Sequence, residues 1–316
     1  MSDPIVAMAA SRIARGSKSF AGAARLFDAD TRASAFMLYA WCRHCDDEID
    51  GQVLGFQRAP ASSQPLDAVL AELRSKTLAA TRGQAEEPIY IALQRVVQKH
   101  AIPPQHPLDL IRGMEMDVEM ETAGLSYQSL DGVLEYCYHV AGVVGVMMAM
   151  VMGVSDKAVL LRASDLGIAF QLTNIVRDVV PDAEVGRVYL PADMMRAQGL
   201  DETSLALPAN RAKVFAIAEA LLDTAERYYA SAEAGVPHLP FRSAWAVAAA
   251  RRVYRDIGAL VRARGPAAWD QRVATSSARK FAGVALAGRD ASLARSPARG
   301  ARAASRAGLW TPSALS

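Results

Sequence analysis

The sequence predicts an all-α protein with a single domain, and three observations support this. Alternation of polar and apolar residues, the pattern of a half-buried β-strand, is almost absent. Apolar residues instead recur at helical spacing, among abundant Ala, Leu, Arg, Glu and Met, which favour helices. Apolar residues make up 52% of the 316 residues, which is enough for a large core. We therefore expect about ten helices joined by short loops.

Glycine and proline residues predict where these helices end. In chain order, breaks are expected at Gly16, Gly51, Gly55, residues 59–65, Pro103, Pro104, Gly124, Gly186, Pro191, Pro208, Pro237, Pro240, Gly265 and Pro266. The 59–65 segment is too short for a domain linker. The segment after residue 288 is rich in Arg, Ala, Ser and Pro, a composition typical of disorder. We therefore predict one helical domain over residues 1–288 and a basic, disordered tail over residues 289–316.

The charge of the chain argues against nucleic-acid binding. Lys and Arg number 35 and Asp and Glu 33, for a net charge of +2. Residues 285–316 hold five arginines and one aspartate, a net charge of +4, so the rest of the chain carries −2. A body of that charge does not bind nucleic acid by electrostatics alone. The tail either touches anionic lipid or nucleic acid or stays solvated.

Several other classes of protein are excluded. Three cysteines are too few for a disulfide scaffold, and a lone CxxC without a second matched pair does not predict a zinc site. There is no Gly-rich phosphate loop, so nothing indicates NAD(P)H or ATP binding. The N-terminus lacks the pattern of a signal peptide. The longest apolar run, residues 140–154, falls short of the roughly 20 residues that cross a bilayer, which predicts a buried helix in a soluble, cytoplasmic protein.

A first stripe of polar residues lies in the segment 39–50 (YAWCRHCDDEID). Asp46 and Asp50 are four residues apart, so on a helix they share one face, about 6 Å apart along the axis. Arg43 and Tyr39 precede them on that face. The alternative reading of this weak motif is a solvated acidic helix end.

A second stripe lies in an otherwise apolar helix over residues 166–180. Gln171, Asn174, Asp178 and Asp182 follow one another at spacings of three, four and four, again on one helical face. An unpaired buried carboxylate is very costly, so acids in such a helix are paired or bind a metal. This stripe therefore indicates function more strongly than the first.

Taken together, the two stripes predict a metal-assisted diphosphate site. Four carboxylates and an amide oxygen are hard oxygen ligands that suit Mg²⁺, with Mn²⁺ as an alternative. Arg43 and Arg177 lie beside the acids, where cations suit a phosphate rather than a metal. A diphosphate whose other end requires an apolar cavity is a prenyl diphosphate.

Two further segments leave alternatives open. Asp117 and Glu121 also have i, i+4 spacing, but the neighbouring Glu115 and Glu119 favour a solvated acidic face, so Asp117 is only a weak candidate. Residues 136–145 (YCYHVAGVVG) place small side chains on a buried helix. Small side chains allow close helix packing or the close approach of a ligand, and the pattern does not separate the two.

At these residues the chain resembles the squalene/phytoene synthase family, and its bacterial phytoene-forming members most. The matching stretches are collinear over about residues 16–280: 16–20 (GSKSF), 39–50, 113–118 (GMEMDV), 136–145, 166–178 (LGIAFQLTNIVRD), 186–191 (GRVYLP), 242–245 (RSAW) and Tyr254. The resemblance implies an isoprenoid-synthase-type helical bundle around a central apolar cavity. It also implies that Mg²⁺ is held by Asp46, Asp50, Asn174, Asp178 and Asp182.

The resemblance carries roles to further positions of this sequence. It implies catalytic roles for the four aspartates of the stripes together with Arg43, Tyr39 and Tyr136. It implies substrate contacts by Ser17, Ser19, Phe20, Arg177, Gln171, Arg187, Tyr189, Tyr254, Val140 and Ala141.

The implied reaction joins two geranylgeranyl diphosphates head to head. Loss of one diphosphate gives an allylic cation, which the second molecule attacks to form prephytoene diphosphate, and a second ionisation leads to phytoene. The sequence supplies what this chemistry needs: cations for the leaving diphosphate, an apolar cavity that excludes water, and aromatic faces for a carbocation. No NADPH is expected, and peripheral contact with the inner face of the membrane is an expectation because substrate and product are greasy.

Two rival functions remain. An enzyme that makes squalene or dehydrosqualene from farnesyl diphosphate would have the same motifs, because only cavity depth separates C15 from C20 substrates. A non-catalytic relative is the remote alternative, since it would be expected to lose the metal-binding acids that this chain keeps.

The sequence departs from the family pattern at two positions. Pro181 stands directly before Asp182, where the family often has an acid. Proline usually ends or kinks a helix, so we predict a helix break near Val180 that leaves Asp182 at a kink. Glu48 stands between the first two acids, where the family often has an apolar residue, and is expected to face solvent.

Overall fold

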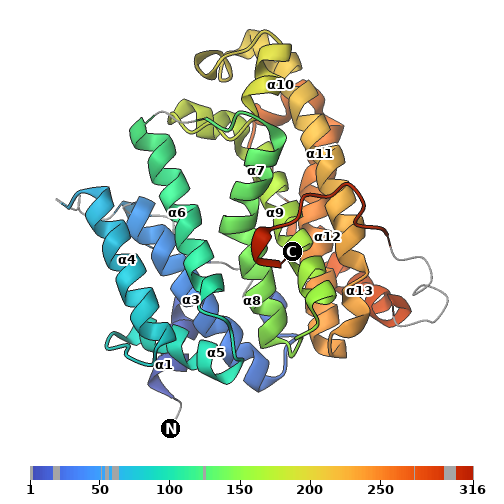
Figure 1. The fold of residues 1–316 in the computed structure, drawn as a ribbon. Helices are drawn as coiled ribbons and strands as arrows, with labels where there is room; N and C mark the ends of the chain where they lie inside the picture. The colour runs from blue at the N-terminus through green and yellow to red at the C-terminus, as the bar shows by residue number, and fades with distance from the viewer. Residues whose placement is uncertain are drawn as a thin grey trace.

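The computed structural model describes residues 3–16, 22–50, 52–53, 57–58, 64–123, 126–273, 275–294 and 304–315. Helices dominate these residues, which confirms the all-α prediction (Figure 1). The α-helices are α1 (Pro4–Gly16), α3 (Ala29–Asp50), α4 (Leu66–Thr81), α5 (Pro88–Lys99), α6 (Gln105–Ala123), α7 (Leu130–Cys137), α8 (Val143–Val151), α9 (Lys157–Glu184), α10 (Ala192–Ala197), α11 (Arg211–Glu233), α12 (Phe241–Arg264) and α13 (Ser277–Ala294).

Short elements connect these helices. A two-residue antiparallel pairing, β1 (Gln52–Val53) with β2 (Gln57–Arg58), follows α3 and was not expected from the sequence. A π-helical turn, η1 (Tyr138–Gly142), joins α7 to α8. The 3₁₀ turns are η2 (Glu202–Ser204), η3 (Pro208–Asn210), η4 (Val236–His238), η5 (Gly265–Trp269) and η6 (Ser313–Leu315).

The helices form two groups around a central layer (Figure 1). α1 and α3–α6 lie on one side, α11–α13 on the other, and α7–α9 between them. α8, α11 and α12 all pack against α9, which is why α9 is apolar on nearly every face. The carboxylate of Asp156 caps the first turn of α9 by accepting a hydrogen bond from the Ala158 amide at 2.8 Å.

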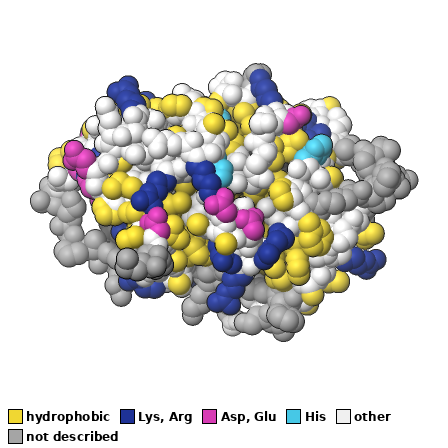
Figure 2. Space-filling model, turned by 90° about the horizontal axis from the view of Figure 1, so that it is seen from below, with side chains coloured by type: hydrophobic (Ala, Val, Ile, Leu, Met, Phe, Trp, Pro, Cys, Tyr) yellow, Lys and Arg dark blue, Asp and Glu magenta, His cyan; other side chains and the backbone are white. Residues whose placement is uncertain are grey.

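The hydrophobic core extends through both groups of helices, and the surface carries apolar as well as charged side chains. Its largest fully buried side chains include Trp41, Leu93, Ile111, Met147 and Leu172. On the underside of the molecule, apolar side chains are interspersed with basic and acidic ones (Figure 2).

Two helical segments, Leu130–Val151 and Lys157–Glu184, are long and apolar enough to cross a membrane by length and composition alone. However, 56% and 61% of the residues in their most apolar windows are buried inside the protein. They are core helices, as predicted for residues 140–154.

Small residues bring the central helices into backbone contact. A Cβ on Gly167 would lie 2.2 Å from the carbonyl oxygen of Ala141, and one on Gly145 would lie 2.4 Å from that of Ala163. No side chain fits in these gaps, so close packing explains the small residues on this segment. Ala141 itself serves this packing.

The predicted break near Val180 is wrong. α9 continues through Pro181 and Asp182 to Glu184. Pro181 lies in the last turn and is exposed, so it costs one backbone hydrogen bond, to the Arg177 carbonyl, at a place where water can replace it. Asp182 therefore lies within the helix and not beyond its end.

Two parts of the segment predicted to be a disordered tail, residues 289–294 and 304–315, have a defined structure in the described part of the chain. α13 continues to Ala294, and residues 304–315 pack across α11 onto the central layer (Figure 1). Arg306 makes two contacts of 2.8 Å with the carboxylate of Asp165, which is fully buried. A buried carboxylate needs a partner, and this one draws the end of the chain onto the core. Residues 295–303 lie outside the described part.

Candidate active site

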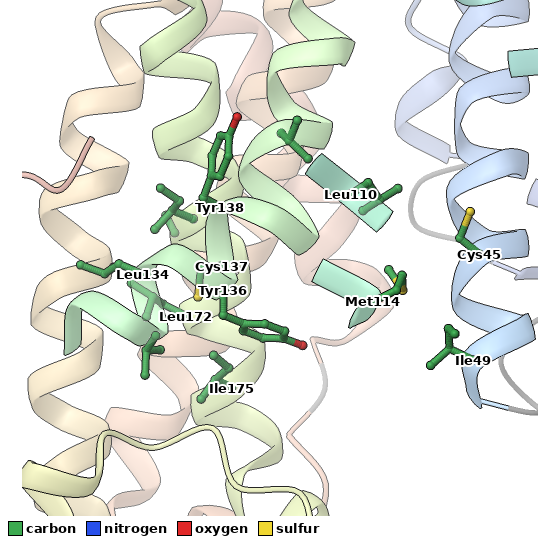
Figure 3. Close-up of a cluster of buried hydrophobic side chains, with 14 of the residues drawn as sticks. Cys45, Ile49, Leu110, Met114, Leu134, Tyr136, Cys137, Tyr138, Leu172 and Ile175 are labelled. Atoms are coloured by element: carbon green, nitrogen blue, oxygen red, sulfur yellow. The ribbon is translucent and has the colours of Figure 1, made fainter. Parts of the chain in front are cut away.

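A cavity of about 220 Å³ lies where α3, α6, α7, η1, α9 and the loop after α9 meet. Six of the predicted site residues line it: Asp46, Tyr136, Val140, Gln171, Arg187 and Tyr189. Ile49 and Met114 add an apolar wall, and Tyr136 points from α7 toward them (Figure 3). Asp117 is the ninth lining residue. The sequence reasoning overlooked Ile49 and Met114 because an apolar residue at helical spacing looks the same in a core and in a cavity wall.

The first acidic stripe borders this cavity. Asp46 lines it, and Arg43 lies beside the acids, with its Nη1 3.7 Å from Asp46 Oδ2 and its Nε donating to Asp47 Oδ1 at 3.0 Å. A guanidinium between two carboxylates is placed to meet an incoming phosphate. Asp50 ends α3, but its side chain lies outside the described part. Glu48 is exposed, as expected.

The tyrosine that begins this stripe points toward the end of α1. A Cβ on Gly16 would lie 3.0 Å from the Tyr39 hydroxyl. Tyr39 therefore lies close to Gly16, the last residue of α1. The predicted contacts Ser17, Ser19 and Phe20 follow Gly16 in the sequence and lie outside the described residues. Burial raises the pKa of Tyr39, so it acts as a neutral phenol.

The second stripe combines an ion pair with an unsatisfied amide. Arg177 Nε donates to Asp178 Oδ1 at 2.8 Å, and a second nitrogen contacts the other oxygen. The side chain of Asn174 donates to Gln171 Oε1 at 3.2 Å, while its own Oδ1 is buried without a hydrogen-bond partner. Burial and the nearby Asp178 raise the pKa of Asp182 to about 7, partly offset by Arg187 and Arg177.

These residues fit a divalent cation. Crowded carboxylates and an orphaned amide oxygen are the groups that a hard cation satisfies. Within the described residues, no group of three His, Cys, Asp or Glu side chains is close enough to hold a metal alone. Mg²⁺ commonly takes one or two carboxylates plus substrate phosphates, so the donor set suits a metal completed by a diphosphate.

Tyr136 and Tyr189 form one wall of the cavity. Their rings stack with centroids 5.1 Å apart, and the ring of Tyr127, which does not line the cavity, has its centroid 5.3 Å from that of Tyr136. Arg187 Nε donates to Glu121 Oε1 at 2.7 Å, which holds the loop after α9 against α6. Such a wall offers aromatic faces to a cation.

The remaining predicted residues do not line the cavity. Tyr254 stacks on Phe170 at 4.2 Å, and the positive charge of Arg177 acts on its phenol. Asn174, Arg177, Asp178 and Asp182 lie on α9 beside the lining residue Gln171. A diphosphate between the stripes would extend the site beyond the cavity.

A helical bundle in which the acidic stripes of two helices lie at and beside a cavity lined by charged, aromatic and apolar side chains is the arrangement of an isoprenoid synthase. The chain belongs to the squalene/phytoene synthase family, whose pattern it matches over residues 13–280.

Two relatives and two solved structures illustrate the match. The 15-cis-phytoene synthase of Enterobacter agglomerans is 55% identical over 267 residues, which cover 84% of this chain and 89% of that protein. That of Paracoccus sp. is 49% identical and covers 98% of both chains. A dehydrosqualene synthase in complex with a ligand shares the fold with a TM-score of 0.79 and 28% identity, covering 90% of this chain and 95% of that one. The squalene synthase HpnC of Alicyclobacillus acidocaldarius, with a TM-score of 0.73 and 20% identity over 83% of this chain and 94% of that one, supports the fold alone.

Proposed function

We propose that this protein is a 15-cis-phytoene synthase, a prenyltransferase of carotenoid biosynthesis that joins two geranylgeranyl diphosphates head to head through prephytoene diphosphate. The observation that carries this is the 49–55% identity to 15-cis-phytoene synthases over most of both chains. The dehydrosqualene synthase structure, at 28% identity, keeps farnesyl diphosphate as the second candidate substrate.

The metal ion and the diphosphate are bound by different residues of the site. Mg²⁺, or Mn²⁺, would be held by Asp46 and Asp50 on α3 and by Asn174, Asp178 and Asp182 on α9, and would stabilise the leaving diphosphate. Arg43 and Arg177 bind the diphosphate oxygens through their guanidinium groups. Neither half of the proposed reaction consumes a reductant, so no NADPH is required.

The cavity wall protects the cation formed after ionisation. Ile49, Met114 and Val140 exclude water that would quench an allylic cation. The stacked rings of Tyr136 and Tyr189 stabilise positive charge through their faces. Ser17, Ser19, Phe20 and Tyr254 are proposed as further substrate contacts on the ground of the family resemblance.

A product assay tests the substrate. Purified protein is incubated with Mg²⁺ and either geranylgeranyl or farnesyl diphosphate, without NADPH, and the hydrocarbon is identified by its mass. We expect phytoene from the C20 substrate alone. A C30 product from farnesyl diphosphate alone would move the chain to the dehydrosqualene-forming branch, and no product from either substrate would support a non-catalytic relative.

Matched variants test the acidic residues. Asp46→Asn and Asp178→Asn remove one charge from each stripe and keep the side-chain size. We expect turnover to fall by at least about 100-fold in each, with an unchanged fold by circular dichroism. Glu48→Gln is the control, because Glu48 lies on the same helix as Asp46 but is exposed. Wild-type rates in both Asn variants would refute the metal site.

We also propose peripheral contact with an anionic membrane through α13. Leu286 and Leu293 are 46% and 39% exposed and lie seven residues apart, on one helical face. Arg279 and Arg289, also exposed, share this face. Apolar side chains flanked by arginines are typical of helices that lie in the surface of an anionic bilayer. This contact would place the enzyme in the cytoplasm at the inner face of the membrane, into which hydrophobic substrates partition.

Vesicle flotation tests this contact. The variant Leu286→Ser/Leu293→Ser should lose binding to phosphatidylglycerol vesicles and keep its activity on detergent-solubilised substrate. Leu207→Ser is the control, since Leu207 is 52% exposed but lies before η3. Undiminished binding of the double variant would remove α13 as the contact.

A further inference from the structure

Asp117 on α6 joins two tyrosines that come from other parts of the chain. The hydroxyl of Tyr136, on α7, donates to Asp117 Oδ2 at 3.3 Å. The hydroxyl of Tyr189, in the loop after α9, donates to Asp117 Oδ1 at 3.1 Å. All three side chains line the cavity that also holds Asp46. One carboxylate therefore connects three separate segments of the cavity wall.

The other acids nearby on α6 behave differently. Glu115 pairs with Arg74 at 2.9 Å, and Glu119 pairs with Arg112 at 2.6 Å, in partly exposed contacts. These acids form the solvated face that the sequence suggested for this segment. Asp117 departs from it, because its side chain turns to the cavity and accepts hydrogen bonds from the two phenols.

The hydrogen bonds set both the geometry and the electronics of the rings. They hold the hydroxyl ends of Tyr136 and Tyr189 to one anchor while the rings stack with an interplanar angle of 21°. A phenol that donates to a carboxylate gains electron density, which strengthens the attraction of its ring for a cation. The carboxylate also adds a fixed negative charge to a wall that faces a developing carbocation.

We propose that Asp117 is a positioning residue of the active site, which anchors the Tyr136 and Tyr189 hydroxyls so that their rings stabilise the carbocation formed after diphosphate loss. This inference rests on the proposed condensation of prenyl diphosphates. It gives Asp117 a role in stabilising the carbocation, whereas the aspartates of the two stripes are proposed as metal ligands.

A double-mutant cycle tests the inference. Asp117→Asn keeps the size of the side chain but removes its charge and one of its two acceptors. If Asp117 acts through the tyrosines, Asp117→Asn should lower kcat by about 10-fold or more with a KM within about threefold of wild type, because it weakens an interaction made in the transition state. Added to Tyr136→Phe/Tyr189→Phe, the same change should cost less than about threefold, since the two hydroxyls that Asp117 anchors are already gone.

Two controls separate this role from a structural one. Glu119→Gln, on the solvated face of the same helix, should keep wild-type kcat. Tyr127→Phe removes a hydroxyl that is buried without a hydrogen-bond partner and leaves the ring against Tyr136, so it should have little effect on kcat. If Asp117→Asn fails to melt cooperatively, the Tyr136→Phe/Tyr189→Phe variant carries the test, because it breaks both hydrogen bonds and keeps the carboxylate.

The outcomes are distinguishable. A wild-type kcat in Asp117→Asn overturns the inference, and so does a loss of equal size in the wild-type and double-Phe backgrounds, which would mean that Asp117 acts without the tyrosines. A wild-type kcat in the double-Phe variant also overturns it. If the wild-type protein makes no product from either geranylgeranyl or farnesyl diphosphate, the proposed function fails and the inference fails with it.

Discussion

Replacing Arg306 by alanine should destabilise the protein, because it removes the partner of a fully buried carboxylate. The side chain of Asp165 is 0% exposed and that of Arg306 is 16% exposed. Both guanidinium contacts are 2.8 Å long, and the Ser231 hydroxyl donates to the same carboxylate. Arg306 also donates to the carbonyl of Trp310 at 3.1 Å, so it ties residues 304–315 together as well as to the core.

The size of the effect follows from this burial. Breaking a buried ion pair by removing one partner costs about 3–5 kcal/mol, since the remaining charge is left in a medium of low polarity. Ser231 keeps one hydrogen bond to Asp165, which places the expected cost of Arg306→Ala near the lower end, at about 3 kcal/mol. A protein of this size loses roughly 2 °C of melting temperature per kcal/mol, so the expected fall is about 6 °C.

Thermal melting followed by circular dichroism measures this fall. Arg255→Ala is the matched control, because Arg255 pairs with Glu226 on the surface, with side chains 55% and 39% exposed, where an ion pair contributes at most about 1 kcal/mol. Adding Asp165→Asn to Arg306→Ala should recover part of the loss, since it removes the unpaired charge. A melting temperature of Arg306→Ala within about 1 °C of wild type would refute the reasoning.

Three further predictions follow from the central helix. Gly167→Ala should cost about 1–3 kcal/mol in thermal melting, because its Cβ would lie 2.2 Å from a backbone oxygen, whereas Gly22→Ala, with open space around the Cβ, should be close to neutral. Pro181→Ala should raise the melting temperature by about 1–3 °C, because α9 continues through this position, and a lower melting temperature would contradict this. Because the pKa of Asp182 is raised to about 7 from an ordinary 3.8, the folded metal-free protein binds this proton more tightly than the unfolded chain, so the stabilising contribution is full below about pH 4 and is lost as the pH rises through 7. Asp182→Asn should therefore flatten the fall in melting temperature between pH 5 and 8 in EDTA, and an unchanged slope would contradict the raised pKa.

Local spacing explains why much of the site was predictable. Helical periodicity and family motifs predict Asp46, Gln171 and Arg187 as site residues, and the structure brings them to one cavity. The continuation of α9 through Pro181 was missed, because the rule that proline ends a helix is strongest in helix interiors and weak in a last turn exposed to water.

Contacts between distant segments were not predictable. Asp117 has the same i, i+4 acidic spacing as its solvated neighbours, and only the packing of α6 against α7 and the loop after α9 turns it toward Tyr136 and Tyr189. The segment around Arg306 has the composition of a disordered tail, and nothing local reveals that its partner is Asp165, 141 residues earlier.

The sequence by itself determined the helices, the two acidic stripes and the family, because each depends on residues a few positions apart or on motifs that are collinear with those of the family. The tertiary structure decided which acids face the cavity, which carboxylate anchors the tyrosines, and how the end of the chain closes on the core. These depend on burial, and burial is a property of the packed helices together and of no single segment.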